Sequence, residues 1–393
     1  MAASAPAAFA PRRAGGTRSI GRIEVFDDPA KAEEPWAALE AACPGSFYQS
    51  RGFLLPWISA YAAPLGITPM LVVARSSEGA PVAMLPFGVR RRGAVHVAEY
   101  LGGKDSNANM GLFLPDVDFA RDDLASMMRA AAAKAPVKPD LFLLTNQPVG
   151  WENARNVLDF ISHQGSPSFL HGGPLRDDAG APAPPKLSKD AAKKLRSKRR
   201  KLEALGPVDH VVARDGASAK RILDAFFEQK LARFKEKRID SEFDKPETRA
   251  FLEAASATRA GAPGPVELHA LMVGERIVAT YAGGVHRGRM HFMVNSFDAD
   301  PEIARSSPGD LLLQSILEQK SAEGLEAFDL GIGEARYKDS WCGQTVAMFD
   351  SIMPVTPLGR VAARFESLRL NVKRRLKQSE TAWPLVQKLL GRR

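Results

Sequence analysis

A short apolar strand near the end of the chain is followed by residue types that can do chemistry. Phe328-Asp329-Leu330 has the pattern of a buried strand, two glycines follow it, and then come Glu334, Tyr337, Lys338 and Trp341. Binding sites of α/β proteins tend to lie where strands end, and carboxylates, phenols and amines there can move protons. The alternative is structural: Tyr337 and Trp341 pack in the core, and Lys338 is solvated.

Motif spacing excludes several classes of site. Gly331 and Gly333 do not begin a dinucleotide fingerprint, because the third glycine position is Arg336 and no strand-helix-strand unit with a distal acidic residue follows. The sequence has no nucleophile elbow, P-loop or kinase signature. Neither HExxH nor a Cys/His cluster occurs, so we expect no metal site.

Polar residues also interrupt apolar strands in the second half of the chain. His269, His291 and Asn295 lie in stretches that are otherwise apolar. Simple alternation predicts His291, Met293 and Asn295 on one face of a strand, where they would line a substrate-binding groove. A hydrogen-bonded structural histidine is the commoner explanation.

Positive charge is concentrated in two predicted helices. The segment 186–201 holds nine Lys or Arg residues and one acid, Asp190. A second helix, from 357, has an apolar pattern among basic residues at Leu358, Val361, Phe365, Leu368, Val372 and Leu376. The apolar and basic pattern of this second helix predicts weak contact with an anionic membrane surface. Without stacking aromatics or a zinc finger we expect no sequence-specific nucleic-acid binding; solvated faces of docked helices are the alternative.

Composition is that of an ordinary globular protein. The chain has 393 residues, a net charge of +9 and 45% hydrophobic residues, which suggests two domains with sizeable cores. Two cysteines, Cys43 and Cys342, cannot form a disulfide framework, so we expect a cytoplasmic location, with peripheral contact at the inner face of the membrane as an option. No apolar run is long enough to span a bilayer. The oligomeric state is left open.

The elements that must position these residues recur twice. Each half has the pattern strand, helix, three-stranded meander, helix, strand, and an offset of 196 aligns several identical residues. The aligned pairs are Ala74 with Ala270, Val82 with Val278, Ala83 with Ala279, Gly88 with Gly284, Val89 with Val285 and Arg91 with Arg287. We interpret this as two tandem copies of one fold, with chance matching as the alternative.

Turn-forming residues divide the two copies. Gly172-Gly173-Pro174 and the proline-rich 181–185 predict a linker without helix or central strand. The expected order is a flexible tail at 1–19, a first domain at 20–170, a linker at 171–187, a second domain at 188–356 and a basic amphipathic C-terminal helix at 357–393.

Four blocks of the second copy resemble a known family. They are Arg276-Ile-Val-Ala-Thr-Tyr-Ala-Gly-Gly, His291-Phe-Met-Val-Asn-Ser-Phe-Asp, Ser307-Pro-Gly-Asp-Leu-Leu-Leu and Phe328-Asp-Leu-Gly-Ile-Gly-Glu-Ala-Arg-Tyr-Lys-Asp-Ser-Trp. They resemble the GNAT-superfamily acyltransferase domain of CelD-like proteins, which are often linked to cellulose or exopolysaccharide formation and related in fold to FemAB aminoacyltransferases. The resemblance implies an α/β (α+β) class: tandem GNAT-like acyl-CoA N-acyltransferase folds with mixed central sheets flanked by helices.

The resemblance also implies a donor site. GNAT domains hold the pyrophosphate of CoA on amides at a helix start, where the helix dipole favours anions. The matching residues are Arg305, Ser306, Ser307 and Gly309, although the glycine comes one place late and Asp310 would repel a phosphate unless it points away. The alternative is an ordinary helix start with proline in its first turn.

Acyl transfer from acetyl-CoA or another acyl-CoA, the reaction that the resemblance implies, needs a base for the acceptor and a proton donor or cation for the departing thiolate or the oxyanion. Glu334 would be the base, Tyr337 the proton donor and Lys338 the oxyanion or phosphate contact. His291, Asn295, Asp329 and Trp341 are the expected substrate-binding residues. The expected acceptor is a small molecule or saccharide with an amine or hydroxyl. The alternatives are a FemAB-like transferase that uses aminoacyl-tRNA and a non-catalytic scaffold at a polysaccharide-synthesis complex.

Overall fold

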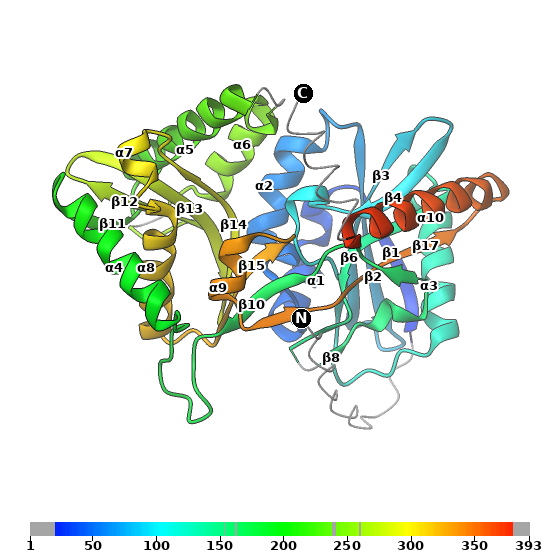
Figure 1. Cartoon of the computed structure of the whole chain (residues 1–393). Helices are drawn as coiled ribbons and strands as arrows, with labels where there is room; N and C mark the ends of the chain where they lie inside the picture. Colours follow the sequence, from blue (N-terminus) through cyan, green and yellow to red (C-terminus); the bar gives the residue numbers. More distant parts are fainter. Residues whose placement is uncertain (1–19, 153, 162, 238–240, 259–260, 380–393) are drawn as a thin grey trace. The chain divides into compact units, whose positions relative to one another are not determined.

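The computed structural model describes residues 20–379, except 153, 162, 238–240 and 259–260. The chain divides into two compact units (Figure 1): unit 1 takes its described residues from 20–170 and 346–379, and unit 2 from 171–345. The expected tail at 1–19 and the end of the C-terminal segment lie outside the described residues. No helix in the described ranges is both long and apolar enough to cross a membrane.

Unit 1 is built on a mixed sheet with the strand order β1-β2-β3-β4-β6-β17-β9, and β5 pairs with β3. The strands are β1 (Ile20–Phe26), β2 (Ile67–Ser76), β3 (Pro81–Arg92), β4 (Val95–Tyr100), β5 (Leu112–Phe113), β6 (Leu141–Pro148), β9 (His163–Gly165) and β17 (Met348–Pro354), with a separate pair, β7 (Gly150–Trp151) and β8 (Ala154–Arg155). The helices are α1 (Glu33–Ala42), α2 (Arg51–Tyr61), α3 (Arg121–Lys134) and α10 (Pro357–Gln378), with short 3-10 turns at Pro29–Ala32, Phe47–Gln49, Gly103–Asp105 and Val157–Phe160.

Unit 2 is built on a second mixed sheet with the order β11-β12-β13-β14-β15-β10-β16. Its strands are β10 (Leu170–Pro174), β11 (Val208–Val212), β12 (Val266–Val273), β13 (Arg276–His286), β14 (Arg289–Phe297), β15 (Ala327–Ile332) and β16 (Gln344–Val346). Its helices are α4 (Lys189–Glu203), α5 (Gly216–Lys237), α6 (Pro246–Ala255), α7 (Pro301–Ala304), α8 (Pro308–Ala322) and α9 (Arg336–Trp341), with a 3-10 turn at Glu242–Asp244.

The first five main strands of the two sheets have the same topology, which confirms the predicted fold class. In each sheet four strands pair antiparallel in chain order, and the fourth pairs parallel with the next main strand: β4 with β6, and β14 with β15. The offset of 196 superposes β3 on β13, the third strand of each sheet. In both copies one long helix, α3 or α8, connects the parallel strands.

Two helices cover opposite faces of the sheet of unit 2. Gln229 of α5 accepts a hydrogen bond from Ser296, which pairs with Thr280 of β13. Lys320 of α8 forms an ion pair with Glu267, whose partner on β13 lies three residues from Thr280 and therefore on the other face. The α8 face holds an apolar core cluster that includes Leu312 and Ile316.

The predicted linker was wrong at its start. Residues 170–174 form β10, which lies between β15 and β16 in the sheet of unit 2. The glycines that suggested a turn are required by close packing, since a Cβ on Gly172 would lie 2.4 Å from the carbonyl oxygen of Phe328. A turn does follow, with a bridge between Arg176 and Pro182.

The chain returns to unit 1 earlier than the expected end of the second domain at residue 356. β17 pairs antiparallel with β6 and β9 of unit 1. The returning strand is followed by α10, which packs on β17 and β6 and is drawn in red in Figure 1.

Candidate active site

The parallel strands β14 and β15 pair only at their beginnings. Their register joins Arg289 to Ala327, Met290 to Phe328 and His291 to Asp329, and the pairing stops there although both strands continue. Diverging strands expose backbone donors and acceptors to which an extended ligand can add as a strand would.

A β-bulge follows at the same place on β14. Ala282 pairs with Val294 and Gly283 with Phe292, so Met293 is an extra residue without a partner on β13. The prediction that His291, Met293 and Asn295 share one face was therefore wrong. His291 pairs with Gly284 and Asn295 with Tyr281, three residues apart on a regular strand, so the two side chains lie on opposite faces.

Two of the predicted substrate-binding residues meet where the strands diverge. The Nδ1 atom of His291 lies 2.7 Å from Oδ2 of Asp329, and both side chains are buried. The other carboxylate oxygen, Oδ1, accepts a hydrogen bond from the amide of Gly331 at 3.2 Å. The pair therefore lies inside unit 2, on the α5 face of the sheet.

The start of α8 combines features of an anion site. Ser307 precedes the helix in a left-handed conformation (φ 48°), and no side chain caps the first turn. The ammonium of Lys198, from the basic helix α4, donates to Oγ of Ser307 at 2.6 Å. A Cβ on Gly309 would meet no atom within 4 Å, so the backbone is open to an approaching group. Helix amides, the helix dipole and a lysine thus converge.

The other donor residues predicted at this turn differ in exposure. Arg305 is exposed, whereas Ser306 is buried. Asp310 accepts a hydrogen bond from the buried Trp341, and burial raises the pKa of its carboxyl group against the opposing effects of Trp341 and Lys198. The raised pKa of Asp310 and its hydrogen bond from Trp341 both reduce the repulsion between this carboxyl group and a phosphate, compared with a free carboxylate.

Tyr337 lies close to this turn. It packs against the apolar core, and burial, followed by the charges of Cys342 and Asp310, raises the pKa of its phenol to about 12. Nearby on β13 and β14, Tyr281 and Asn295 are hydrogen-bonded through their side chains. The α8 face of the sheet therefore holds Asn295, Trp341 and Tyr337, close to the turn 305–309 that contains the predicted donor residues.

Lys338 is buried and holds the end of β15. Its ammonium donates to the carbonyl oxygens of Gly331 at 3.0 Å and Ile332 at 2.9 Å. Burial lowers its pKa to about 8. These contacts fix the turn that leads from β15 to α9.

Glu334 is the exposed member of the cluster. Its side chain is 61% exposed, and its Oε1 lies 3.3 Å from Nε2 of the buried His171 on β10. A general base must contact the acceptor, and an acceptor that arrives from solvent can reach the exposed carboxylate of Glu334. Sequence reasoning missed His171 because that residue was assigned to the linker.

The equivalent gap in unit 1 is filled by the chain itself. β4 and β6 pair only at Val97–Leu141 and Ala98–Phe142. Beyond that point, the backbone N–H of Asn109 donates to the carbonyl oxygen of Asn146 at 2.9 Å. The side-chain nitrogen of Asn109 donates to the carbonyl oxygen of Thr145, also at 2.9 Å. The connecting helix α3 begins with Asp122 and Asp123 in its first turn, which disfavours an anion there.

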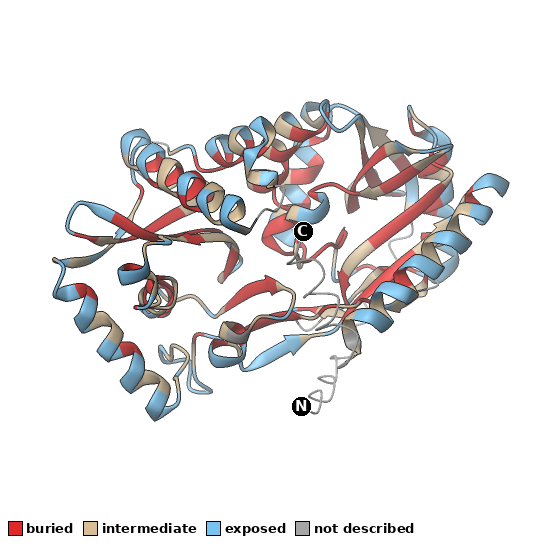
Figure 2. Cartoon of the chain, turned by 45° about the horizontal axis from the view of Figure 1, so that its top comes forward, coloured by how far each residue is buried: buried red, intermediate tan, exposed pale blue. Residues whose placement is uncertain are grey.

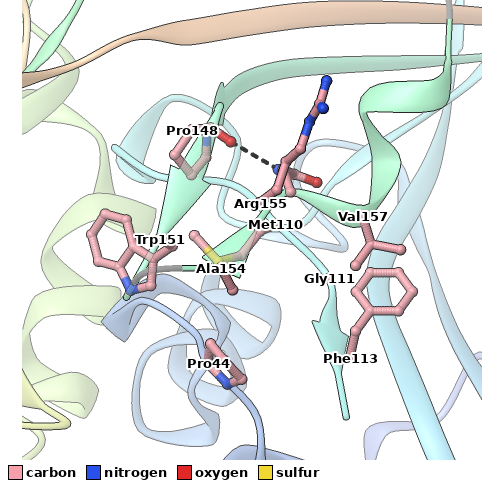
Figure 3. A pocket seen from close by; sticks show the side chains of 10 residues that line it. Pro44, Met110, Gly111, Phe113, Pro148, Trp151, Ala154, Arg155 and Val157 are labelled. Carbon is pink, nitrogen blue, oxygen red and sulfur yellow. Dashed lines mark hydrogen bonds between the residues drawn. The ribbon is translucent and has the colours of Figure 1, made fainter. Parts of the chain in front are cut away.

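Two hollows lie away from the α8 start. In unit 1, Met110, Phe113 and Trp151 help to line a small, mostly apolar hollow of about 40 Å³ (Figure 3). In unit 2, α5 and the β12–β13 hairpin border a groove of about 760 Å³, where charged side chains pair with one another, as Arg276 does with Asp298. Among the described residues, no group of three or more His, Cys, Asp or Glu side chains could hold a metal ion.

Comparisons with known proteins concern the fold of the chain. Residues 189–339 match the family described as "Acetyltransferase (GNAT) domain". Unit 2 has the GNAT acyltransferase fold. A search of curated proteins found no match to the sequence.

Solved structures resemble the chain at low sequence identity, which shows the fold alone. FemX has a TM-score of 0.57 and 10% identity, covering 87% of this chain and 100% of that one. The C-terminal domain (DUF2156) of a putative lysylphosphatidylglycerol synthetase from Agrobacterium fabrum has a TM-score of 0.52 and 14% identity, covering 87% and 97%. L-PGS from Bacillus licheniformis has a TM-score of 0.51 and 12% identity, covering 91% and 100%.

Proposed function

We propose that unit 2 transfers an acyl group, such as acetyl, from acyl-CoA to an amine or hydroxyl acceptor, and that it holds the donor phosphates at the start of α8. The observation that carries the proposal is the 2.6 Å contact between Lys198 and Ser307 beside the open Gly309. A lysine at an uncapped helix start supplies charge and amides for a pyrophosphate.

The diverging strands supply the path for the rest of the donor. The gap opens beyond His291 and Asp329, and the bulge at Met293 frees a backbone position on β14. An extended pantetheine-like arm needs such unpaired groups. The filled gap and acidic α3 start in unit 1 support a single donor site, in unit 2.

Acyl transfer requires that the acceptor lose a proton and that the leaving sulfur gain one. Tyr337 suits the second role, because a phenol with a pKa of about 12 stays protonated at neutral pH. Glu334, exposed beside His171, suits the first. The contacts of Lys338 support a positioning role, since its ammonium already donates to two carbonyl oxygens.

The acceptor class rests on the sequence resemblance. The likeness of 276–341 to CelD-like proteins supports a saccharide or cell-envelope acceptor. An aminoacyl-tRNA donor is the second candidate, because α4 exposes Lys193, Lys194 and Lys201 on the helix that reaches the α8 start. Both candidates predict turnover, which a scaffold would not show.

Calorimetry with CoA and acetyl-CoA tests the donor site. Gly309→Val should weaken binding at least about tenfold, because a valine side chain would occupy the space that a phosphate needs. Gly216→Val is the matched control, since Gly216 also lies at a helix start where an added Cβ would meet no atom within 4 Å. No binding by the wild type at millimolar CoA, or equal binding by both variants, would contradict the proposal. Binding of aminoacyl-tRNA alone would favour the second candidate.

A further inference from the structure

The last helix of unit 1 turns an apolar stripe toward solvent. Its large apolar side chains are exposed to between 41% and 70% of their surface, most of all Phe365 at 70% and Leu368 at 63%. The members of this outer stripe are Leu358, Val361, Phe365, Leu368, Val372 and Leu376. At 3.6 residues per turn they fall within an arc of about 80° along a helix about 33 Å long. In Figure 2 this outer side of α10 is largely pale blue.

The opposite side of α10 holds the helix on unit 1. Leu370 is buried with Leu141 and Leu143 of β6. Gly359 approaches the backbone of Asp140 so closely that a Cβ would clash with its carbonyl oxygen. Thr356 caps the helix and donates to Asp140 at 2.6 Å. The outer stripe is therefore not needed to attach the helix.

Basic residues border the outer stripe on both sides. By helical rotation, Arg364 and Arg375 follow one edge, and Arg369 and Lys373 follow the other. The helix carries seven Arg or Lys residues against one acid, Glu366. An apolar centre between two basic rows matches a surface whose anionic groups surround an apolar interior.

We propose that α10 docks unit 1 on an anionic lipid surface, with the outer stripe inserted between the headgroups and the flanking cations on the phosphates. The helix would lie in the plane of the interface. This proposal uses only unit 1 and does not depend on the proposed acyl transfer.

The charge pattern favours lipid over a protein groove. A groove that closed around the stripe would have to desolvate or pair both basic rows, which is costly without matched carboxylates. At a membrane interface, long arginine and lysine side chains keep their charges in the headgroup layer while their stems cover apolar surface.

Cosedimentation of the full chain with vesicles tests the proposal. The wild type should partition at least about tenfold more onto phosphatidylcholine vesicles containing phosphatidylglycerol than onto phosphatidylcholine alone, and added salt should weaken the binding. Phe365→Ser with Leu368→Ser should lower the partition at least about tenfold, and so should Arg364→Glu with Arg375→Glu.

The controls place comparable changes elsewhere. Leu65→Ser with Leu205→Ser alters apolar side chains that are 43% and 47% exposed, and should leave vesicle binding unchanged. Lys193→Glu with Arg196→Glu reverses charge on α4, whose leucines Leu195 and Leu202 are buried, and should reduce binding less than the α10 pair does.

Several results would overturn the proposal. They are absence of wild-type binding to the anionic vesicles, unchanged binding by the serine variant, and an equal loss with the α4 charges. Light scattering adds another: a wild-type dimer that the serine variant abolishes, without lipid binding, would make the stripe a contact between copies of this chain.

Discussion

Replacing His210 with glutamine should make unit 2 less sensitive to acid. His210 on β11 has its Nε2 atom 3.0 Å from Nδ1 of the fully buried His269. Burial, then the charges of His269 and Lys320, lower the pKa of His210 from 6.5 to about 4. The pKa of His269 is also lowered, mainly by burial.

The same network fastens α8 to the sheet. Lys320, in the last turn of α8, forms ion pairs with Glu267 at 2.7 Å and Glu323 at 2.8 Å. Burial would raise the pKa of Glu267, but hydrogen bonds from His269 and Lys320 outweigh it and lower this pKa to about 2. Protonation of His210 or His269 places extra positive charge beside Lys320 and therefore disfavours the folded arrangement. Lys320 belongs to α8, and the opposite end of that helix is the proposed donor site.

The magnitude follows from linkage. Because the folded pKa of His210 is depressed, its contribution to stability is complete above pH 6.5 and is lost as the pH falls toward 4. One unit of pKa corresponds to about 1.4 kcal/mol, so between pH 7 and pH 5 this group costs about 2 kcal/mol of unfolding free energy. His210→Gln should remove that loss and leave the part that belongs to His269.

Hydrogen exchange measured by mass spectrometry can isolate this effect. The opening free energies of β11, β12 and α8 are compared at pH 7 and pH 5, after correction for intrinsic exchange, with β2 and β3 of unit 1 as internal reference. His163→Gln, at an exposed histidine of β9, is the matched control and should leave the acid sensitivity of unit 2 unchanged. If His210→Gln loses as much stability between the two pH values as the wild type, the reasoning from the buried pair is refuted.

Two further expectations concern the cluster after β15. Tyr337→Phe should keep the melting temperature and lower turnover about 100- to 10,000-fold, because it removes only the phenol proton; steady-state kinetics with an identified acceptor and a thermal melt check this, and full activity would contradict the role. Lys338→Met should lower the unfolding free energy by about 2 kcal/mol, because the carbonyl oxygens of Gly331 and Ile332 lose a charged hydrogen-bond donor. Removing the cost of burying the ammonium offsets only part of that loss. Denaturant unfolding measures the change, and unchanged stability would show that the two contacts contribute little.

The meander and the long helix of each copy could be predicted because their signals are local. Alternation and helical periodicity predicted a three-stranded meander followed by a helix in each half, and the structure has β2 to β4 with α3, and β12 to β14 with α8. The offset of 196 indicated the two copies. The bulge at Met293 could not be predicted, since it depends on pairing between β13 and β14 and reverses the alternation after it. Glycines 172 and 173 were misassigned to a turn because a close strand contact and a turn both favour glycine.

The site itself depends on contacts between distant parts of the sequence. Lys198 and Ser307 are 109 residues apart, and His171 and Glu334 are 163 apart. Nothing in the local pattern distinguishes Lys198 from the other basic residues of α4. Sequence reasoning could therefore propose the start of α8 and the residues after β15. It could not identify Lys198 as the lysine that contacts Ser307.

The two copies illustrate which features a repeated fold must keep. The order and pairing of the first five main strands are retained in both units because each core requires them, whereas the turns that begin α3 and α8 carry no such constraint. One turn has Asp122 and Asp123, and the other has Ser307 with Lys198. The charges at these two turns, rather than the shared topology, therefore favour a phosphate ligand in one unit and disfavour it in the other.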